Sequence, residues 1–329
     1  MKNIALLIPE GDTSLSNIEA TYKMFTKVNE ALERQGKPPI FKVHLVGLTR
    51  EPRYTHVFTI QPDLGLDNDL RADLVIIPAV HGDINKVLEM NKDFIPWIIK
   101  QYKYGSGLVS LCIGAFILAS TGLLDGRSCT THWLVANEFR NMFPQVKLVP
   151  YKIITDEDGI YSSGGAYSSL NLILYLVEKF AGRELAILTA KVFEIEIDRE
   201  SQSPFMMFKG QKEHEDEDII KAQDFIEANY QEKITVDQLA EMTCMGRRNF
   251  ERRFRRSTSN SVVEYIQRVK IEAAKRSLET TRENVNEVMY KVGYTDTKAF
   301  RTTFKKITGL SPVQYRLKYN KENAMQFDN

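Results

Sequence analysis

Cysteine is scarce in this sequence, and long apolar runs are absent. Three cysteines occur in 329 residues, at positions 112, 129 and 244, and none has the CxxC spacing of a zinc site or redox pair. This pattern argues against a disulfide framework and a metal site, and we expect no cofactor. No stretch approaches 18 uninterrupted apolar residues, and the run after Met1 is too short for a secretory signal. We therefore expect a cytoplasmic protein with no membrane partner.

A strong net charge is also absent, because 44 Lys+Arg nearly balance 43 Asp+Glu. The balance hides an asymmetry along the chain. Residues 219–319 hold 20 Lys+Arg against 12 Asp+Glu, a surplus of eight positive charges, and the rest of the chain has seven more acids than bases. A basic segment of this kind is typical of a polyanion-binding module attached to a domain with another task.

The first 208 residues alternate short, β-rich apolar runs with segments of helical period. Such alternation predicts an α/β domain with a parallel sheet and helices on both faces. The predicted strands are 4–8, 41–46, 74–78, 108–112, 152–155 and 160–163, and the predicted helices are 16–34, 84–103, 113–121, 167–181 and 184–196. Ligand sites in such sheets lie beyond the carboxyl ends of the strands.

One strand end carries a reactive atom. Cys112 stands at a sharp strand-to-helix turn, where Gly114 permits close backbone approach and the start of the next helix favours the thiolate. His132, near the start of a later helix, is a candidate base or ion-pair partner. The spacing alone fits a buried structural cysteine as well.

Residues 108–133, LVSLCIGAFILASTGLLDGRSCTTHW, resemble the cysteine-elbow segment of the PfpI superfamily of intracellular proteases and glyoxalase-like enzymes. Residues 159–186 resemble the segment that follows in the amidase-like regulators of that superfamily. The match spans most of residues 3–208. It implies a flavodoxin-like fold, also described as glutamine-amidotransferase-like, with Cys112 at the nucleophile position and His132 as its partner.

The chain departs from the enzymes of that superfamily in two places. Their acidic residue after the first strand corresponds, counting from Gly11, to Ser16, and their Pro-Gly-Gly oxyanion turn reads Pro78-Ala79-Val80. These departures imply a domain that binds a small-molecule effector, or senses a reactive species through Cys112, without turnover. The predicted pocket residues are Gly11, Ser16, Ala79, Val80, His81, Cys112, Ile113 and His132. The alternative is an active cysteine-dependent hydrolase or glyoxalase-like enzyme.

Residues 209–218, KGQKEHEDED, are polar and lack an apolar period, which predicts a linker between two domains. His214 among these acids fits a solvated linker better than a metal site. We therefore expect domains at 1–208 and 219–319 and a polar tail at 320–329.

Residues 246–256, GRRNFERRFRR, separate apolar from basic side chains when wound at 3.6 residues per turn. Phe250 and Phe254 define an inward face, and Arg248, Arg252 and Arg255 fall on the opposite side. A capping box at 235–238 opens a short helix that ends in a tight turn just before this stretch, which completes a helix-turn-helix. The alternative for this stretch alone is a solvated basic surface helix.

The same pattern returns 50 residues later, with Phe300 and Phe304 as the inward pair. The helical wheel turns Lys298, Thr302 and Lys305 outward. A long helix at 262–279 connects the two units.

This duplication and residues 300–316, FRTTFKKITGLSPVQYR, strongly resemble the DNA-binding domain of the AraC family over residues 219–319. The resemblance implies an all-α domain whose two recognition helices enter successive major-groove segments, about 34 Å apart. Gly246 departs from the family, which usually has a serine cap there. The predicted DNA-binding residues are Arg247, Arg248, Glu251, Arg252, Arg255, Lys298, Arg301, Thr302 and Lys305.

Together the two resemblances imply a transcription regulator of the GlxA-like subgroup, which joins a PfpI-type domain to an AraC-type double helix-turn-helix. The expected partners are a double-stranded DNA operator, an unidentified small-molecule effector, RNA polymerase and a second copy of the chain in a homodimer. A scaffold whose basic end binds any polyanion is the remaining alternative, and it predicts no sequence preference.

Overall fold

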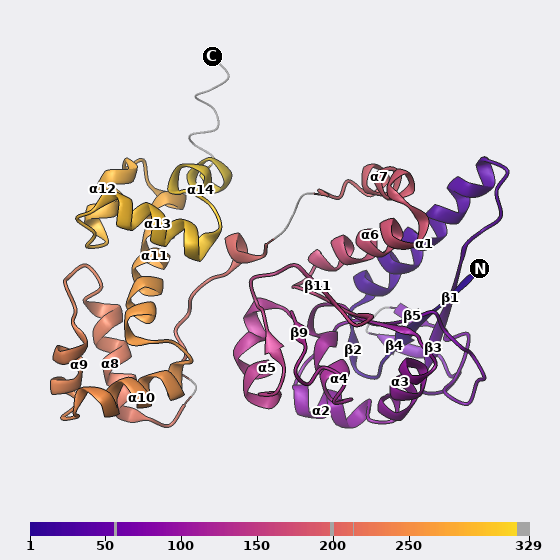
Figure 1. The fold of residues 1–329 in the computed structure, drawn as a ribbon, viewed down its shortest axis with the longest axis horizontal. Helices are drawn as coiled ribbons and strands as arrows, with labels where there is room; N and C mark the ends of the chain where they lie inside the picture. Colours follow the sequence, from indigo (N-terminus) through magenta and orange to yellow (C-terminus); the bar gives the residue numbers. More distant parts are fainter. Residues whose placement is uncertain (56–57, 198–200, 213, 321–329) are drawn as a thin grey trace, which may run out of the picture. The chain divides into compact units, whose positions relative to one another are not determined.

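The structure is a computed structural model that describes residues 1–55, 58–197, 201–212 and 214–320. It divides into two compact units, Met1–Gln202 and Ser203–Asn329 (Figure 1). The first unit is α/β and the second is helical, which confirms the predicted fold classes. Residues 203–208, which the sequence assigns to the first domain, belong to the helical unit. None of the described helices is long and apolar enough to cross a membrane.

A six-stranded sheet in the order β11-β12-β8-β6-β1-β3 forms the centre of the first unit. Neighbouring strands are parallel except β11 and β12, which are antiparallel. The strands are β1 Lys2–Ile8, β3 Phe41–Gly47, β6 Leu74–Ile77, β8 Gly107–Ser110, β11 Ile154–Glu157 and β12 Ile160–Ser163. Three small two-stranded sheets pair β2 Asp12–Thr13 with β7 Val80–His81, β4 Arg53–Thr55 with β5 Phe58–Ile60, and β9 Ser128–Cys129 with β10 Lys147–Leu148.

Helices cover both faces of this sheet because alternate strand residues are apolar on both sides (Figure 1). In β1, Ile4 and Leu6 pack with one set of helices, and Ala5 and Leu7 pack with the other. The first set is α1 Leu15–Arg34, α6 Ser168–Ala181 and α7 Arg183–Val192. The second set is α2 Ile84–Met90, α3 Phe94–Lys103, α4 Ala115–Ala119 and α5 Ala136–Met142.

The prediction of a single helix at 84–103 is wrong, because the structure has two helices there, α2 and α3. The break lies at Asn91, which is buried. Its Oδ1 accepts a hydrogen bond from the Glu10 N–H at 2.7 Å, and its Nδ2 donates to the Glu10 carbonyl oxygen at 3.0 Å. These two bonds to a distant loop fix the side chain of Asn91 and end α2.

The second unit contains two helix-turn-helix units on one connecting helix, α11. Its described α-helices are α8 Glu217–Ala228, α9 Val236–Met242, α10 Arg247–Thr258, α11 Val262–Thr280, α12 Val285–Lys291, α13 Thr297–Thr308 and α14 Pro312–Tyr319. Each helix-turn-helix unit has its own apolar core, and α11 contributes to both cores, with Val269 in the first and Ile271 in the second.

The predicted inward orientation of the phenylalanine pairs is confirmed. All four are completely buried: Phe250, Phe254, Phe300 and Phe304. The repeat also extends beyond them. Tyr265 and Tyr315, again 50 residues apart, pack edge-on against the second phenylalanine of each pair, with ring centroids 5.3 and 5.4 Å apart. Each tyrosine hydroxyl donates to a glutamate, at 2.6 and 2.5 Å.

Candidate DNA-binding surface and ligand pocket

The first candidate recognition helix is α10. Its N-cap is Gly246, which offers no side chain to the free N–H groups of the first turn. The inward phenylalanines leave one face of the helix to solvent, and that face is basic. The exposed arginines of α10 are Arg247, Arg248, Arg252, Arg255 and Arg256. Such a face suits contacts with DNA phosphates and with guanine edges.

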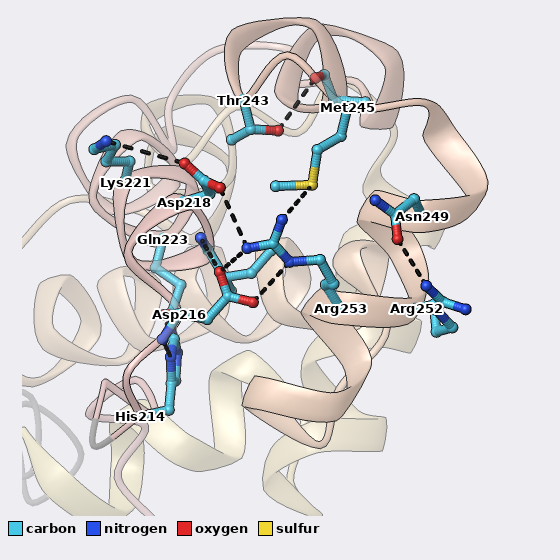
Figure 2. A network of polar contacts seen from close by, with 12 residues as sticks. His214, Asp216, Asp218, Lys221, Gln223, Thr243, Met245, Asn249, Arg252 and Arg253 are labelled. Atoms are coloured by element: carbon cyan, nitrogen blue, oxygen red, sulfur yellow. Dashed lines mark hydrogen bonds and ion pairs between the residues drawn. The ribbon is translucent and has the colours of Figure 1, made fainter.

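Ion pairs already engage part of this face. Arg247 Nη1 lies 3.1 Å from Asp237 Oδ2, and Arg247 Nε lies 3.5 Å from Glu251 Oε1. Arg252 donates to Asn249 Oδ1 at 2.9 Å (Figure 2). The two predicted DNA-contact residues Arg247 and Glu251 are therefore paired with each other in this structure. Exposed pairs of this kind are weak, so DNA can replace them at little cost.

The second candidate recognition helix, α13, has a side-chain cap. The Asp296 carboxylate accepts a hydrogen bond from the Ala299 N–H at 2.5 Å. The predicted DNA-contact residues of this helix are all exposed: Lys298, Arg301, Thr302 and Lys305. This face carries fewer arginines than that of α10, so the two helices offer different donors to DNA.

A buried lysine fixes one helix-turn-helix unit against the other. Lys270 of α11 is 7% exposed, and its Nζ donates to the carbonyl oxygens of Glu232, Val292 and Gly293 at 3.2, 3.2 and 3.3 Å. Burial lowers the pKa of Lys270. Glu232 precedes α9 and the other two residues follow α12, so these bonds join the two units. The sequence does not predict a role for Lys270. The one feature that could have indicated it is its position four residues after Ile266, which places a lysine on the apolar side of α11.

Cys112 follows β8 and has a left-handed backbone with φ 55°, the strained geometry of an elbow turn. Gly114 is required there, because a Cβ would lie 2.5 Å from the Ile77 carbonyl oxygen. The Cys112 residue is 4% exposed, and its Sγ accepts a hydrogen bond from the Ala166 N–H at 3.3 Å. Burial raises the pKa of this thiol. The backbone N–H groups of Ala166 and Ile113 favour the thiolate, as the sequence predicts for the helix start, but desolvation outweighs them, so the net effect disfavours the thiolate.

Asn17 is the α1 residue that points inward near this turn, whereas Ser16 is exposed and contacts Ser14. Asn17 is 5% exposed, and its Nδ2 donates to Ser169 Oγ at 3.1 Å. Its Oδ1 accepts a hydrogen bond from the Ala79 N–H at 3.1 Å. An oxyanion pocket needs free backbone N–H groups in the turn after β6. The Ala79 N–H in that turn is already bound to Asn17.

The other predicted pocket residues lie at different depths. The pairing of β2 with β7 brings the segment after Gly11 beside Val80 and His81. Val80 is buried, as is Ala79, whereas Gly11 and His81 are exposed. Ile113 is half-buried. The structure therefore gathers most of the predicted set around one turn but leaves Ser16 at the surface.

His132 is half-buried, and its Nδ1 accepts a hydrogen bond from the Leu134 N–H at 3.1 Å, which places the ring proton on Nε2. Its ring packs against Gly165, which leaves no room for a Cβ there. Burial and the nearby His81 lower the pKa of His132. Among the hydrogen bonds of the described residues, none joins His132 to Cys112.

Comparisons with known proteins give the same two-part division. A DJ-1/PfpI family model matches residues 6–179, and a helix-turn-helix domain model matches residues 239–318. The HTH-type transcriptional regulator GbdR of Pseudomonas aeruginosa is 28% identical over 261 residues, 78% of this chain and 69% of GbdR. The HTH-type transcriptional regulator GlxA of Rhizobium meliloti is 21% identical over 215 residues, 65% of this chain and 66% of GlxA. The isonitrile hydratase of Pseudomonas putida is 25% identical over 171 residues, 51% of this chain and 70% of that protein.

Two solved structures share the fold of the first unit. An AraC family transcriptional regulator from Pseudomonas putida has a TM-score of 0.51 at 15% identity and covers 59% of this chain and 100% of its own. A THiJ/PfpI family protein from Pseudomonas syringae has a TM-score of 0.50 at 16% identity and covers 60% of this chain and 76% of its own. The first family model covers more than half of the sequence, and the second falls on the helices from α9 to α14. The chain therefore belongs to the DJ-1/PfpI family, and its second unit contains a helix-turn-helix domain.

Proposed function

We propose that this protein is a sequence-specific DNA-binding transcription regulator whose first unit binds a small effector without converting it. The observation that carries the proposal is the repeated unit in which α10 and α13 each bury two phenylalanines and expose a basic face. The connecting helix and Lys270 hold these two faces in one block. Relatives that are transcriptional regulators, such as GbdR and GlxA, support the same function.

In this proposal each basic helix enters one segment of the DNA major groove, with the two segments about one turn, ~10.5 base pairs, apart. Arg248 and Arg252 of α10 and Lys298 and Thr302 of α13 contact base edges. Other exposed cations, such as Lys305, contact phosphates and make the affinity salt-dependent.

The first unit is proposed to hold its effector beside Cys112. Three features there oppose thiol catalysis: burial raises the pKa of the Cys112 thiol, no described hydrogen bond links it to His132, and Asn17 occupies the Ala79 N–H. The similarity to isonitrile hydratase supports the alternative that the first unit is an enzyme. That alternative requires turnover of an isonitrile, an amide or methylglyoxal that Cys112→Ser abolishes.

Selection of binding sites from a random duplex library by the full chain tests the proposal. We expect enrichment of one motif with two boxes about one DNA turn apart. The Arg248→Ala/Arg252→Ala double variant, which changes only exposed side chains of α10, is the control, and it should lose one box of that motif. Binding that merely fades with salt, with no motif enriched, would favour the polyanion scaffold.

Homodimer formation through the first unit and contact with RNA polymerase are further parts of the proposal. Both rest on analogy with regulators that share these domains. Sedimentation of the full chain measures the first, and co-sedimentation with the polymerase on the enriched duplex measures the second.

A further inference from the structure

The segment that begins the helical unit, from residue 203 onward, is bound to the helices of that unit. We call residues 203–212 and 214–216 the strap. The Met206 carbonyl oxygen accepts a hydrogen bond from Lys275 Nζ at 2.6 Å, and the Phe208 N–H donates to Glu272 Oε2 at 3.1 Å. The Phe208 ring packs edge-on against Tyr265, with centroids 5.0 Å apart. The first half of the strap is thus anchored on α11.

The second half of the strap satisfies a buried amide of α8. Gln223 is completely buried. Its Nε2 donates to the Gln211 carbonyl oxygen at 3.0 Å, and its Oε1 lies 2.9 Å from His214 Nε2. Lys212 pairs with Asp224 at 2.6 Å. Among the described residues the strap supplies two of the three partners of this buried amide, and the Tyr265 hydroxyl is the third. Because buried polar groups need such partners, these bonds hold the strap on the helical unit.

The strap ends on the first recognition helix. Asp216 caps α8 and also accepts two hydrogen bonds from Arg253 of α10, Nε to Oδ2 at 2.9 Å and Nη2 to Oδ1 at 2.6 Å (Figure 2). Arg253 also donates to Asp218 at 3.2 Å and to the sulfur of Met245, in the turn before α10, at 3.3 Å. The Arg253 guanidinium holds the pKa of the Asp216 carboxyl below its usual range. One side chain therefore joins the strap, the turn and the recognition helix.

The chain that becomes the strap leaves the first unit beside Cys112. Gln202 directly precedes the strap and is 2% exposed. Its Oε1 accepts a hydrogen bond from the Gly165 N–H at 3.1 Å, and its Nε2 donates to the Thr131 carbonyl oxygen at 3.0 Å. Gly165 is followed by Ala166, whose N–H binds Cys112 Sγ, and Thr131 Oγ1 donates to the Cys112 carbonyl oxygen at 2.9 Å. Two short hydrogen-bonded paths thus connect Cys112 with Gln202, the residue before the strap.

We propose that the strap positions α10 on DNA, and that Arg253 is the positioning residue through which the segment leaving the Cys112 site controls this helix. The inference rests on the proposed function, because it takes α10 as a DNA-contacting helix. Arg253 lies on the side of α10, between the buried phenylalanines and the exposed arginines, and a two-bond arginine–carboxylate pair fixes orientation as well as position. Base recognition needs a helix held to within about 0.5 Å. The repeat supplies an internal comparison, since Thr303 stands 50 residues after Arg253 and α13 has no such pair with a carboxylate among the described residues.

The test is Asp216→Asn in the full chain. Asparagine keeps the α8 cap but removes the charge that pairs with Arg253. Glu217→Gln is the matched control, because it makes the same charge change at the next residue, which is exposed and forms no ion pair with Arg253. Two readouts are used: quantitative footprinting on the enriched two-box duplex, and amide hydrogen exchange of the DNA-free protein. The box read by α10 is the one whose base preference changes in Arg252→Ala.

We expect Asp216→Asn to weaken protection of the α10 box about fivefold, in line with the loss of a partly exposed charged pair, and to leave the α13 box unchanged. Exchange should quicken in α10 and not in α13. Combining Asp216→Asn with Arg253→Met should add little to either single change, because both remove one contact. Glu217→Gln should match the unchanged protein in both readouts.

Gly210→Ala provides a second perturbation that changes no charge. Gly210 has φ 70°, and a Cβ there would lie 2.8 Å from the Tyr265 hydroxyl, so alanine displaces the strap. The same loss confined to α10 supports the proposal. Equal weakening of both boxes by both variants, or unchanged exchange of α10 in both, overturns it. If no duplex is enriched, the proposed function fails, and the exchange measurement still decides whether the strap holds α10.

Discussion

The three cysteines of this chain differ in exposure, and their reactivities should differ accordingly. Cys244 is exposed, whereas Cys112 and Cys129 are buried. Burial raises the pKa of Cys112, and it raises that of Cys129 to about 12. Because the thiolate is the nucleophile, iodoacetamide should alkylate Cys244 at least about tenfold faster than the other two in the folded protein at about pH 8. Peptide mapping by mass spectrometry measures the three rates.

Unfolding in denaturant is the control for this experiment, since all three thiols should then react alike. Labelling of Cys112 as fast as Cys244 in the folded protein would mean that the thiolate forms at this site. Direct oxidation sensing at Cys112 would then become the better account of the first unit.

Protonation of His132 should destabilise the first unit. Burial and His81 lower the pKa of His132, so the unfolded chain binds this proton at a higher pH than the folded chain does. The free energy of unfolding should therefore be highest above the usual histidine pKa of about 6.5 and fall as pH drops through that value toward the lower folded pKa. Denaturant titrations between about pH 7.5 and pH 5.5 measure this, and both tryptophans, Trp97 and Trp133, report on the first unit.

His132→Asn separates this residue from the other titrating groups. Asparagine can still accept the hydrogen bond from the Leu134 N–H, but it does not titrate. The variant should show a flatter pH profile over the same range. A profile as steep as that of the unchanged protein would contradict the assignment to His132.

At the scale of the element, the two recognition helices differ in their first turn. Gly246, the N-cap of α10, has an ordinary φ of −68°, and no heavy atom lies within 4 Å of a Cβ built there. Gly246→Ser should therefore stabilise the helical unit by a few tenths to about 1 kcal/mol, because serine caps the helix and restricts the unfolded chain. Asp296→Ala, at the matching position of α13, should cost about 1 kcal/mol. Hydrogen exchange of the first-turn amides in each helix measures both effects.

A glycine with the opposite backbone provides the control for Gly246→Ser. Gly36 also has open space around a Cβ, but its φ is 69°. Gly36→Ser should therefore destabilise its own unit. If Gly246→Ser slows amide exchange in neither recognition helix, the missing cap does not limit the stability of α10.

The elements with strong local period are the ones that the sequence predicts. The phenylalanine pairs locate α10 and α13, and the apolar runs locate the strands of the sheet. Elements that end on a distant partner are missed. Asn91 interrupts the helix predicted at 84–103 because Glu10 binds its side chain. Counting from Gly11 predicts that Ser16 points into the pocket, but the residue that points inward is Asn17. An error of one residue on a helix turns the expected side-chain direction by about 100°. Sequence periodicity does not reveal such an error, because the partner that fixes the residue, here the Ala79 N–H, lies far away in the sequence.

The strap shows the same limit more strongly. Residues 209–218 have the composition of a solvated linker, yet Lys212 and Asp216 each pair with a side chain of the helical unit. Composition records that charges are present but not that each one has a matching charge elsewhere in the fold. Lys270 was missed for a related reason, because its partners are backbone carbonyl groups.

At the scale of the whole molecule, the repeat makes the two helix-turn-helix units alike in their cores and unlike in their attachments. Tyr265 and Tyr315 pack in the same way, but the two units meet different parts of the strap. The end of the strap pairs with Arg253 of α10, whereas its start contacts α14, where the Tyr319 hydroxyl donates to the Pro204 carbonyl oxygen at 3.2 Å. In the proposal made above, a signal that passes along the strap acts on α10 through the ion pair between Asp216 and Arg253. No ion pair among the described residues joins α13 to the strap, and Lys270 binds the carbonyl groups of the turn before α13.

The assignment of base and phosphate contacts predicts two different kinds of loss. Arg252→Ala should cost about 1–3 kcal/mol on the preferred duplex and relax the preference at one base position. Lys305→Ala should weaken binding to all sequences similarly and reduce the slope of log affinity against log salt by about 1. Isotherms at several salt concentrations, on the preferred duplex and on duplexes with single base changes, measure both quantities. Both side chains are exposed, so neither change should alter the fold. An unchanged base preference in Arg252→Ala would mean that the exposed face of α10 meets phosphates alone, and sequence choice would then have to come from α13 or from the shape of the duplex.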